Sequence, residues 1–264
     1  MNNTLNKIIS DRRNSIDKYK KFYSVDTLKK NISINKKYFD FKEKLNENKL
    51  SVVAEIKKAS PSAGVIMQNY NPLEIAKKYL SSGATCLSVL TEENYFMGNI
   101  EHIRDIKKEV NLPILCKDFF IDPYQVYLAR SFGADAILII LAALNDKTSK
   151  DIYNVAEDLK ISTIVEVHTK DEAEKALNFK NAIIGINNRN LKTLKTDIKI
   201  TFELHKILNK HKGPIICESG IKSEKQVEEI VKKTKINNFL IGESLLKDLG
   251  KNSSLLERIV KIRP

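Results

Sequence analysis

Tryptophan is absent from this 264-residue chain, cysteine occurs three times, and no apolar run reaches the roughly 18 residues needed to cross a membrane. Without Trp, any aromatic contact made by the N-terminal segment must come from Phe or Tyr. The cysteines Cys86, Cys116 and Cys217 are odd in number and lie within apolar runs. We therefore expect free, buried thiols that behave as small hydrophobic side chains.

Metal-binding motifs are also missing from the sequence. There is no Cys-x-x-Cys or His-x-x-x-His spacing, and the four histidines are scattered, so no metal site is predicted. Only His168 lies near the end of a predicted strand. We expect it to take a supporting or exposed position there rather than a catalytic one.

Arginine is scarce, although the net charge is +12. Only seven of the 45 basic residues are Arg, and the lysines are spread over all predicted helices, usually beside acidic residues. Base readout and bidentate phosphate binding favour Arg, with aromatic side chains for stacking. The composition therefore argues against a nucleic-acid partner. A positive field that attracts an anionic small molecule is the simpler interpretation.

The N-terminal residues lack the apolar core of a secretory signal and lead directly into Asp11, Arg12 and Arg13. Together with the absence of a predicted span, this predicts a cytoplasmic protein without membrane partners. The oligomeric state stays open between a monomer and a weak homo-oligomer.

Eight apolar runs of strand length recur along the chain, separated by segments with helical signals. They are residues 52–54, 84–90, 113–116, 136–140, 163–165, 183–186, 214–217 and 238–241. Continuous apolar runs are typical of parallel strands buried on both faces. Eight such units without a Gly-x-Gly-x-x-Gly motif favour an α/β fold of the closed (β/α)8 TIM barrel type over an open, doubly wound sheet.

The chain divides into two predicted parts, an N-terminal helical extension of residues 1–49 and a barrel catalytic domain of residues 50–264. Within the barrel, Asn71-Pro72 predicts the start of a helix and Gly83 its end. The extension has apolar residues spaced as in short amphipathic helices. Two positions fit it equally, the bottom of the barrel and the mouth of the active site.

Polar residues follow the predicted strands, and in a barrel those strand ends form the active site. The loops after the seventh and eighth strands often bind phosphate through backbone N–H groups. Both loops contain glycine, which lets amides approach an oxyanion closely. The phosphate ligands predicted in these loops are Ser219, Gly220, Gly242 and Glu243.

Five charged side chains also follow strands. They are Glu55, Lys57, Lys117, Glu166 and Glu218. Charges gathered in a cleft must neutralise one another or shift their pKa values. Because carboxylate–lysine pairs supply both an acid and a base near neutral pH, the pattern predicts acid–base catalysis.

Two of these glutamates, Glu55 and Glu166, have different neighbours on their own strands. Glu55 lies two residues before Lys57, so both side chains face the same side of the strand. Glu166 has no lysine at that spacing, since His168 lies two residues on. We therefore expect Glu55 to hold a lysine charged and Glu166 to have a raised pKa that suits a general base.

Six segments carry a resemblance to a known family. They are residues 55–62 (EIKKASPS), 88–96 (SVLTEENYF), 116–119 (CKDF), 185–191 (GINNRNL), 218–221 (ESGI) and 240–245 (LIGESL). In this order they resemble the indole-3-glycerol phosphate synthase family, from about residue 51 to the end. The resemblance implies a carboxy-lyase of tryptophan biosynthesis. Its reaction closes the ring of 1-(2-carboxyphenylamino)-1-deoxyribulose 5-phosphate with loss of CO2 and water, and needs no cofactor.

The resemblance also implies roles for individual residues. Lys117 resembles the general acid that protonates the ketone oxygen as the aryl ring attacks, and Glu166 the general base. Lys57 resembles the lysine that binds the phosphate or the substrate carboxylate and also serves as acid in dehydration. Which lysine acts in which step stays open. Glu55 would orient both lysines through charge pairing.

The remaining site residues come from the same resemblance and from the need for a flat apolar slot for the anthranilate ring. Asn187 and Ser219 join the implied catalytic set. The predicted substrate-binding residues are Ser60, Pro61, Phe96, Phe119, Leu138, Arg189, Leu191 and Glu218, with Leu194 as a further apolar candidate.

Two other classes of function fit these residues less well. A phosphate-binding barrel such as phosphoribosylanthranilate isomerase would use a Cys and an Asp at opposite strand ends, whereas here Cys116 is followed by Lys117. The tryptophan synthase alpha subunit is a second barrel of this kind. A basic nucleic-acid-binding or scaffold protein would not need the polar ring at the strand ends.

Overall fold

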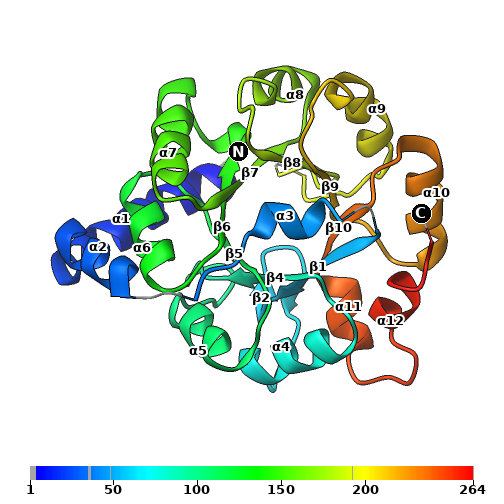
Figure 1. Ribbon diagram of the computed structural model, residues 1–264, viewed down its shortest axis with the longest axis horizontal. Helices are drawn as coiled ribbons and strands as arrows, with labels where there is room; N and C mark the ends of the chain where they lie inside the picture. The colour runs from blue at the N-terminus through cyan, green and yellow to red at the C-terminus, as the bar shows by residue number, and fades with distance from the viewer. Residues whose placement is uncertain (1–3, 35–36, 48, 192, 264) are drawn as a thin grey trace.

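The computed structural model describes residues 4–34, 37–47, 49–191 and 193–263. Parts of both predicted domains, residues 1–3, 35–36, 48, 192 and 264, lie outside the described residues. Within the described residues, parallel strands close into an eight-stranded barrel in the order β1-β10-β9-β8-β7-β6-β5-β4. The predicted (β/α)8 barrel is therefore confirmed (Figure 1). The barrel strands are β1 (Ser51–Ile56), β4 (Cys86–Leu90), β5 (Ile114–Lys117), β6 (Ala136–Ile140), β7 (Ser162–Val167), β8 (Ile183–Asn187), β9 (Ile215–Glu218) and β10 (Asn238–Ile241).

Helices surround the barrel and connect its strands (Figure 1). They are α4 (Pro72–Ser81), α5 (Glu101–Glu109), α6 (Tyr124–Ser131), α7 (Asp146–Asp158), α8 (Lys170–Ala176), α9 (Lys199–Leu208), α10 (Glu224–Thr234), α11 (Glu243–Asp248) and α12 (Leu255–Ile259). A short hairpin, β2 (Ala59–Ser60) and β3 (Gly64–Val65), follows β1, and the 3-10 turn η1 (Leu141–Ala143) follows β6. The predicted start of α4 is confirmed, because the Asn71 side chain accepts the N–H of Glu74 at 3.2 Å and Pro72 occupies the first turn.

Side chains along each strand alternate between the barrel interior and the layer under the helices. The interior holds one apolar cluster, which includes Val53, Leu115, Ile164, Ile216 and Leu240. The intervening residues join the larger outer cluster, as Val52 and Ala54 do. Two residues beyond the interior positions come Glu55, Lys117, Glu166, Glu218 and Gly242. The period of two therefore carries the charged side chains inward at the carboxyl end of the barrel.

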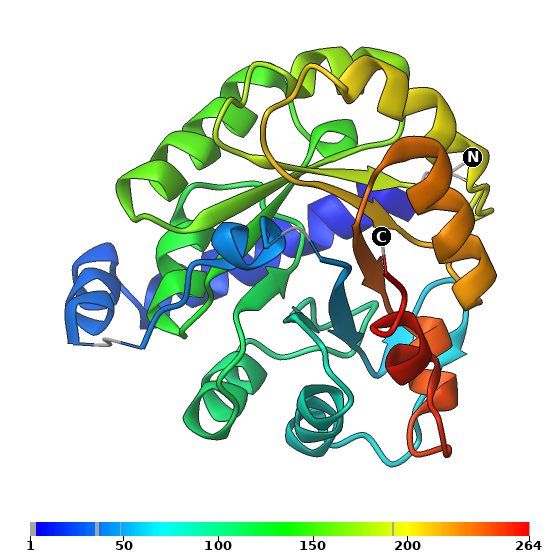
Figure 2. The same ribbon diagram turned by 45° about the vertical axis from the view of Figure 1, so that its right-hand side comes forward.

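The N-terminal extension covers both ends of the barrel. Its helices are α1 (Thr4–Phe22), α2 (Val25–Ile34) and α3 (Phe41–Leu45). In α3, Phe41 and Leu45 are buried in the interior apolar cluster, and the helix lies over the centre of the barrel in Figure 1. Helix α1 runs behind the strands in Figure 2 and contacts η1, at the ends of the strands. The extension thus contacts the bottom of the barrel through α3 and the loops at the opposite end through α1.

None of the helices in the described ranges combines the length and the apolar character needed to cross a membrane. The three cysteines are free and buried, as predicted.

Candidate active site

A cavity of about 810 Å³ opens at the carboxyl ends of the strands. It gathers most of the predicted site residues from strands that are far apart in the sequence. These are Glu55, Lys57, Phe96, Lys117, Phe119, Leu138, Glu166, Asn187, Arg189, Leu191, Glu218, Ser219, Gly220, Gly242 and Glu243. The polar ring at the strand ends is therefore one continuous site.

Three predicted substrate-binding residues lie away from this cavity lining. Ser60 is buried in the β2–β3 hairpin, where its hydroxyl accepts the N–H of Ala63, and Pro61 at the tip is exposed. Leu194 presents its carbonyl oxygen, not its side chain, to Arg189 at 3.1 Å. The hairpin still touches the site, because Arg189 Nη1 donates to Ser62 Oγ at 3.2 Å.

The first charged pair lies at the end of β1. Lys57 Nζ donates to Glu55 Oε1 at 2.5 Å, with both side chains largely buried. A Cβ on Gly242 would lie 2.3 Å from Glu55 Oε1 and 3.0 Å from Lys57 Nζ. Gly242 therefore does more than expose an amide, since its lack of a side chain leaves room for this ion pair.

The second charged group surrounds Lys117. Its ammonium lies 2.9 Å from Glu166 Oε2 and 3.4 Å from Glu218 Oε2, and both carboxylates are almost fully buried. A Cβ on Gly185 would lie 2.1 Å from Glu218 Oε1. Gly185, which the sequence did not single out, makes space for that carboxylate. A lone glycine inside an apolar strand is the signal that points to such a close approach.

Coupling among these groups sets their protonation. Burial lowers the pKa of Lys117, but the carboxylates of Glu166, Glu218 and Glu55 outweigh it and hold that pKa above its usual range. Burial also raises the pKa of Glu166, yet Lys117 and His168 outweigh it and hold the Glu166 pKa well below its usual range. Burial, reinforced by the charge of Glu166 and opposed by Lys117, raises the pKa of Glu218 to about 8.

The prediction of a raised pKa at Glu166 is therefore wrong. That prediction rested on the neighbours of Glu166 along its own strand, which include no lysine. It gave His168 only a supporting or exposed position. In the barrel, Lys117 from β5 reaches Glu166, and His168 Nε2 lies 3.3 Å from Glu166 Oε1. Of the two carboxylates beside Lys117, Glu218 is the one whose pKa is raised, because burial and the charge of Glu166 outweigh Lys117.

The predicted phosphate ligands Ser219, Gly220, Gly242 and Glu243 line the part of the cavity formed by the loops after β9 and β10. Ser219 and Gly220 both have positive φ, 67° and 84°, which is a sharp turn directly after β9. Gly242 precedes the first turn of α11, and the carboxylate of Glu243 turns to Lys247 at 2.5 Å. Backbone N–H groups, not the Glu243 side chain, are thus the groups suited to an anion here.

An apolar wall completes the cavity. The rings of Phe96 and Phe119 lie with their centroids 6.2 Å apart and tilted by 42°. Leu138 from β6 and Leu191 after β8 line the same space. An aromatic ring bound here would have apolar side chains against it and the charged groups of β5, β7 and β9 at its edge.

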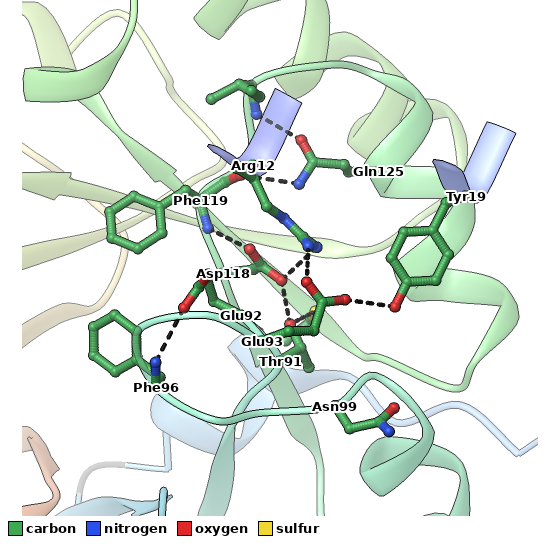
Figure 3. A network of polar contacts seen from close by, with 12 residues as sticks. Arg12, Tyr19, Thr91, Glu92, Glu93, Phe96, Asn99, Asp118, Phe119 and Gln125 are labelled. Atoms are coloured by element: carbon green, nitrogen blue, oxygen red, sulfur yellow. Dashed lines mark hydrogen bonds and ion pairs between the residues drawn. The ribbon is translucent and has the colours of Figure 1, made fainter. Parts of the chain in front are cut away.

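Helix α1 is bonded to the loops that carry this wall (Figure 3). Arg12, only 2% exposed, donates to Asp118 Oδ2 at 2.7 Å and to Glu93 Oε2 at 2.8 Å. Tyr19 donates to Glu93 Oε1 at 2.6 Å. Asp118 lies directly between Lys117 and Phe119, and its Oδ1 accepts the N–H of Phe119 at 2.7 Å.

The loop after β4 is shaped by a second buried carboxylate. Glu92, 1% exposed, accepts the backbone N–H groups of Asn94, Tyr95 and Phe96 at 2.9, 2.7 and 3.1 Å. Figure 3 shows the contact with Phe96, which lines the cavity. Sequence reasoning missed Arg12, Glu92 and Asp118. The scarcity of Arg in a lysine-rich chain was the one available sign that Arg12 has a specific partner.

No cluster of three or more His, Cys, Asp or Glu side chains in the described part of the chain has a geometry suited to a metal ion.

Comparison with known proteins agrees with this geometry. Residues 5–256 match the sequence profile of indole-3-glycerol phosphate synthase. The chain belongs to the indole-3-glycerol phosphate synthase family. It is 39% identical over 262 residues to the indole-3-glycerol phosphate synthase of Trichodesmium erythraeum, covering 97% of this chain and 88% of that protein. It is 43% identical over 253 residues to that of Prochlorococcus marinus strain MIT 9215, covering 93% of this chain and 85% of that protein.

This member of the indole-3-glycerol phosphate synthase family also resembles other solved barrel structures in its fold. N-(5'-phosphoribosyl)anthranilate isomerase of Pyrococcus furiosus superposes with a TM-score of 0.55 at 17% identity, over 80% of this chain and 97% of that one. At this identity the likeness concerns the fold alone.

Proposed function

We propose that this chain closes the indole ring of 1-(2-carboxyphenylamino)-1-deoxyribulose 5-phosphate with loss of CO2 and water, and that Lys117 is the acid that starts the reaction. The observation that carries the proposal is the position of Lys117. Its ammonium lies within ion-pair distance of Glu166 and Glu218, and Lys117 lines the same cavity as the apolar wall and the loops after β9 and β10. A substrate with an aromatic ring at one end and a phosphate at the other would place its central ketone near this lysine.

The proposed chemistry needs only proton transfers. Lys117 protonates the ketone oxygen as the aryl carbon attacks, so that a carbon–carbon bond forms and the ketone becomes a hydroxyl. The carboxylate on that aryl carbon leaves as CO2. The hydroxyl then leaves as water with a proton from Lys57, while Glu166 takes the proton that is lost as the indole double bond forms. The sum consumes one proton, which matches the conversion of a carboxylate into CO2.

The charge pattern supports these roles. Lys57 lies beside Glu55, and this ion pair places its ammonium at the edge of the cavity. Glu166 is ionised and therefore free to accept a proton, although its lowered pKa makes it a weaker base than a neutral-range carboxylate would be. Asn187 and Arg189 line the cavity beside these groups and are proposed to bind substrate oxygens.

The phosphate is proposed to bind Ser219 and the N–H groups of Gly220, Gly242 and Glu243, with Lys57 as the nearest cation. A Cβ built on Gly242 would lie only 3.0 Å from Lys57 Nζ. The lysine ammonium is therefore close to the backbone of this loop. The proposal also includes a cytoplasmic monomer or weak homo-oligomer with no nucleic-acid partner. Light scattering and binding assays with duplex DNA test that part.

The decisive experiment is a fluorescence assay of indole formation with the purified Lys117→Met variant. Losing a general acid costs about 10²–10⁴ in rate, so turnover should fall by that factor while circular dichroism and sulfate affinity stay near wild type. Lys206→Met, on the exposed surface of α9, is the matched control and should retain full turnover. Near-normal turnover of Lys117→Met would contradict the proposal.

A further inference from the structure

A line of alternating charges leads from the surface of the barrel to the proposed acid. It runs from Glu172 to His168, Glu166 and Lys117. His168 follows β7 and lies two residues beyond Glu166, so both side chains face the same side of that strand. The imidazole is hydrogen-bonded to a carboxylate at Nδ1, and at Nε2 it faces a second carboxylate at ion-pair distance without a hydrogen bond. Its Nε2 lies 3.3 Å from Glu166 Oε1, and its Nδ1 lies 3.3 Å from Glu172 Oε2.

Glu172 is itself held in place. It stands in the first turn of α8, where its N–H donates to Thr169 Oγ1 at 3.3 Å. Its Oε2 also accepts the backbone N–H of His168 at 2.7 Å. Glu172 therefore fixes both the backbone and the ring of His168, and the ring has little freedom to leave Glu166.

Glu166 is consequently held from two sides. Its Oε2 faces Lys117 at 2.9 Å and its Oε1 faces His168 at 3.3 Å, and its side chain is 1% exposed. A carboxylate between two cations keeps its charge, whereas the charged groups that act on Glu218 are the cation Lys117 and the carboxylate of Glu166. His168 is thus the feature that distinguishes the two glutamates around Lys117.

We propose that His168 is a positioning residue for the reaction, and that its positive charge keeps Glu166 ionised and aimed at Lys117, so that the proton shared by the two glutamates resides on Glu218. This inference rests on the proposed function of the same site. It assigns a role to a histidine that no proposed chemical step uses directly.

The protonation state of His168 agrees with this role. Burial lowers its pKa, but hydrogen bonding and charge attraction from Glu166 and Glu172 outweigh that effect and raise the pKa to about 9. Among the described residues, the charged groups that act on the imidazole are Glu166 from β7 and Glu172 from α8. The ring is therefore a cation throughout the neutral range.

The test compares kcat of His168→Gln with wild type from pH 6.5 to pH 9.5. Gln keeps an amide donor but removes the charge, and loss of one opposite charge raises a carboxylate pKa by about one unit or more. Without that charge Glu166 is held and aimed at Lys117 from one side only, so kcat at pH 6.5 should fall about tenfold, the effect of about one pKa unit of lost charge attraction. The ratio of variant to wild type should rise toward one near pH 9.5, where wild-type His168 also loses its charge. KM should change by less than about threefold, because His168 does not line the cavity.

Companion variants separate charge from structure. His168→Lys keeps a cation and should recover at least half of the lost rate at pH 6.5. Glu172→Gln should shift the pH dependence in the same direction, and it serves as the test if His168→Gln does not fold. His205→Gln, on α9 away from the site, should leave the ratio flat and near one. In the wild-type enzyme, the NMR titration of the His168 ring should give a pKa near 9.

A ratio that does not change with pH, or a ring pKa at or below 6.5, would overturn the inference. The two proposals fail differently. If Lys117→Met and Glu166→Gln remain active, the proposed function is wrong. If both lose activity while His168→Gln has a pH-independent rate, only the role of His168 is wrong.

Discussion

At the level of single residues, the proposed site depends on where one proton resides. Lys117 is surrounded by carboxylates from three other strands, and buried like charges cannot all remain ionised. Two cations hold Glu166 charged, so Glu218 carries the proton at neutral pH. The site therefore offers a base and an acid within reach of the same lysine, without a metal or cofactor in either proposed role.

Glu218 makes the stability of the fold depend on pH. Its folded pKa of about 8 is above the ordinary 4.5, so its stabilising contribution is complete below pH 4.5 and is lost as pH rises through 8. Glu218→Gln mimics the neutral acid and has no such loss. Between pH 6 and pH 9, urea denaturation should show the free energy of unfolding of wild type falling relative to Glu218→Gln by on the order of 1 kcal/mol or more. A difference that is constant with pH would contradict the raised pKa.

Gly242 is predicted to control the geometry of the Glu55–Lys57 pair. In Gly242→Ala the new Cβ would occupy the position now 2.3 Å from Glu55 Oε1, so the pair must move while the fold survives. A displacement of this size should lower kcat/KM about 10-fold to 100-fold, as measured by steady-state kinetics. Gly250→Ala is the control. Its φ is +84° and its nearest atom would be 3.9 Å away, so it should cost stability but leave kcat/KM unchanged.

At the level of elements, the N-terminal extension is bonded to the loops that carry part of the site. Helix α3 fills the bottom of the barrel with Phe41, while α1 spans the other end and bonds to the loops after β4 and β5. Those loops carry Phe96 and Phe119, and the second also begins at Lys117. The docking of α1 therefore bears on both the apolar wall and the proposed acid (Figure 3).

The strength of this docking is testable through Arg12. Arg12→Met would leave Asp118 buried without its cation, and breaking a buried pair costs about 3–5 kcal/mol in the free energy of unfolding. Lys20→Met is the matched control on the same helix. Its partner is Asp122, and their side chains are 42% and 34% exposed, so its loss should cost no more than about 1 kcal/mol. Equal losses in chemical denaturation would mean that Arg12 does not anchor α1.

At the level of the whole molecule, the net charge of +12 favours anionic ligands in general, whereas the backbone turns after β9 and β10 favour a phosphate at one point. The two effects differ in their dependence on salt. A general field is screened by any electrolyte over about 10 Å at 0.1 M ionic strength, but a specific amide cluster is not.

Inorganic sulfate should therefore inhibit competitively with the substrate. Sodium chloride at matched ionic strength is the control, and it should raise KM less than sulfate does because chloride lacks the tetrahedral oxygens that the amides can bind. Initial-rate measurements at several substrate concentrations distinguish the two. Equal effects of the two salts would contradict a phosphate site in these loops.

The fold was predictable because its signals are local. Eight continuous apolar runs, a helix start at Asn71-Pro72 and an end at Gly83 each depend on a few neighbouring residues, and the structure confirms them. Most predicted site residues line one cavity for the same reason, since a barrel brings all strand ends together. Ser60 and Pro61 do not line it, because the β2–β3 hairpin turns them away after β1, and short hairpins leave little trace in a sequence.

What the sequence determined by itself is the set of groups: the barrel, the charged strand ends, the glycine loops and the family to which these motifs belong. Only the tertiary structure decided how those groups act on one another. The pKa order of Glu166 and Glu218, the pairing of His168 with Glu172, and the contact of Arg12 with Asp118 all depend on distances below 4 Å between residues on different elements. Electrostatic coupling falls with distance and rises with burial, and neither quantity can be read from spacing along one strand.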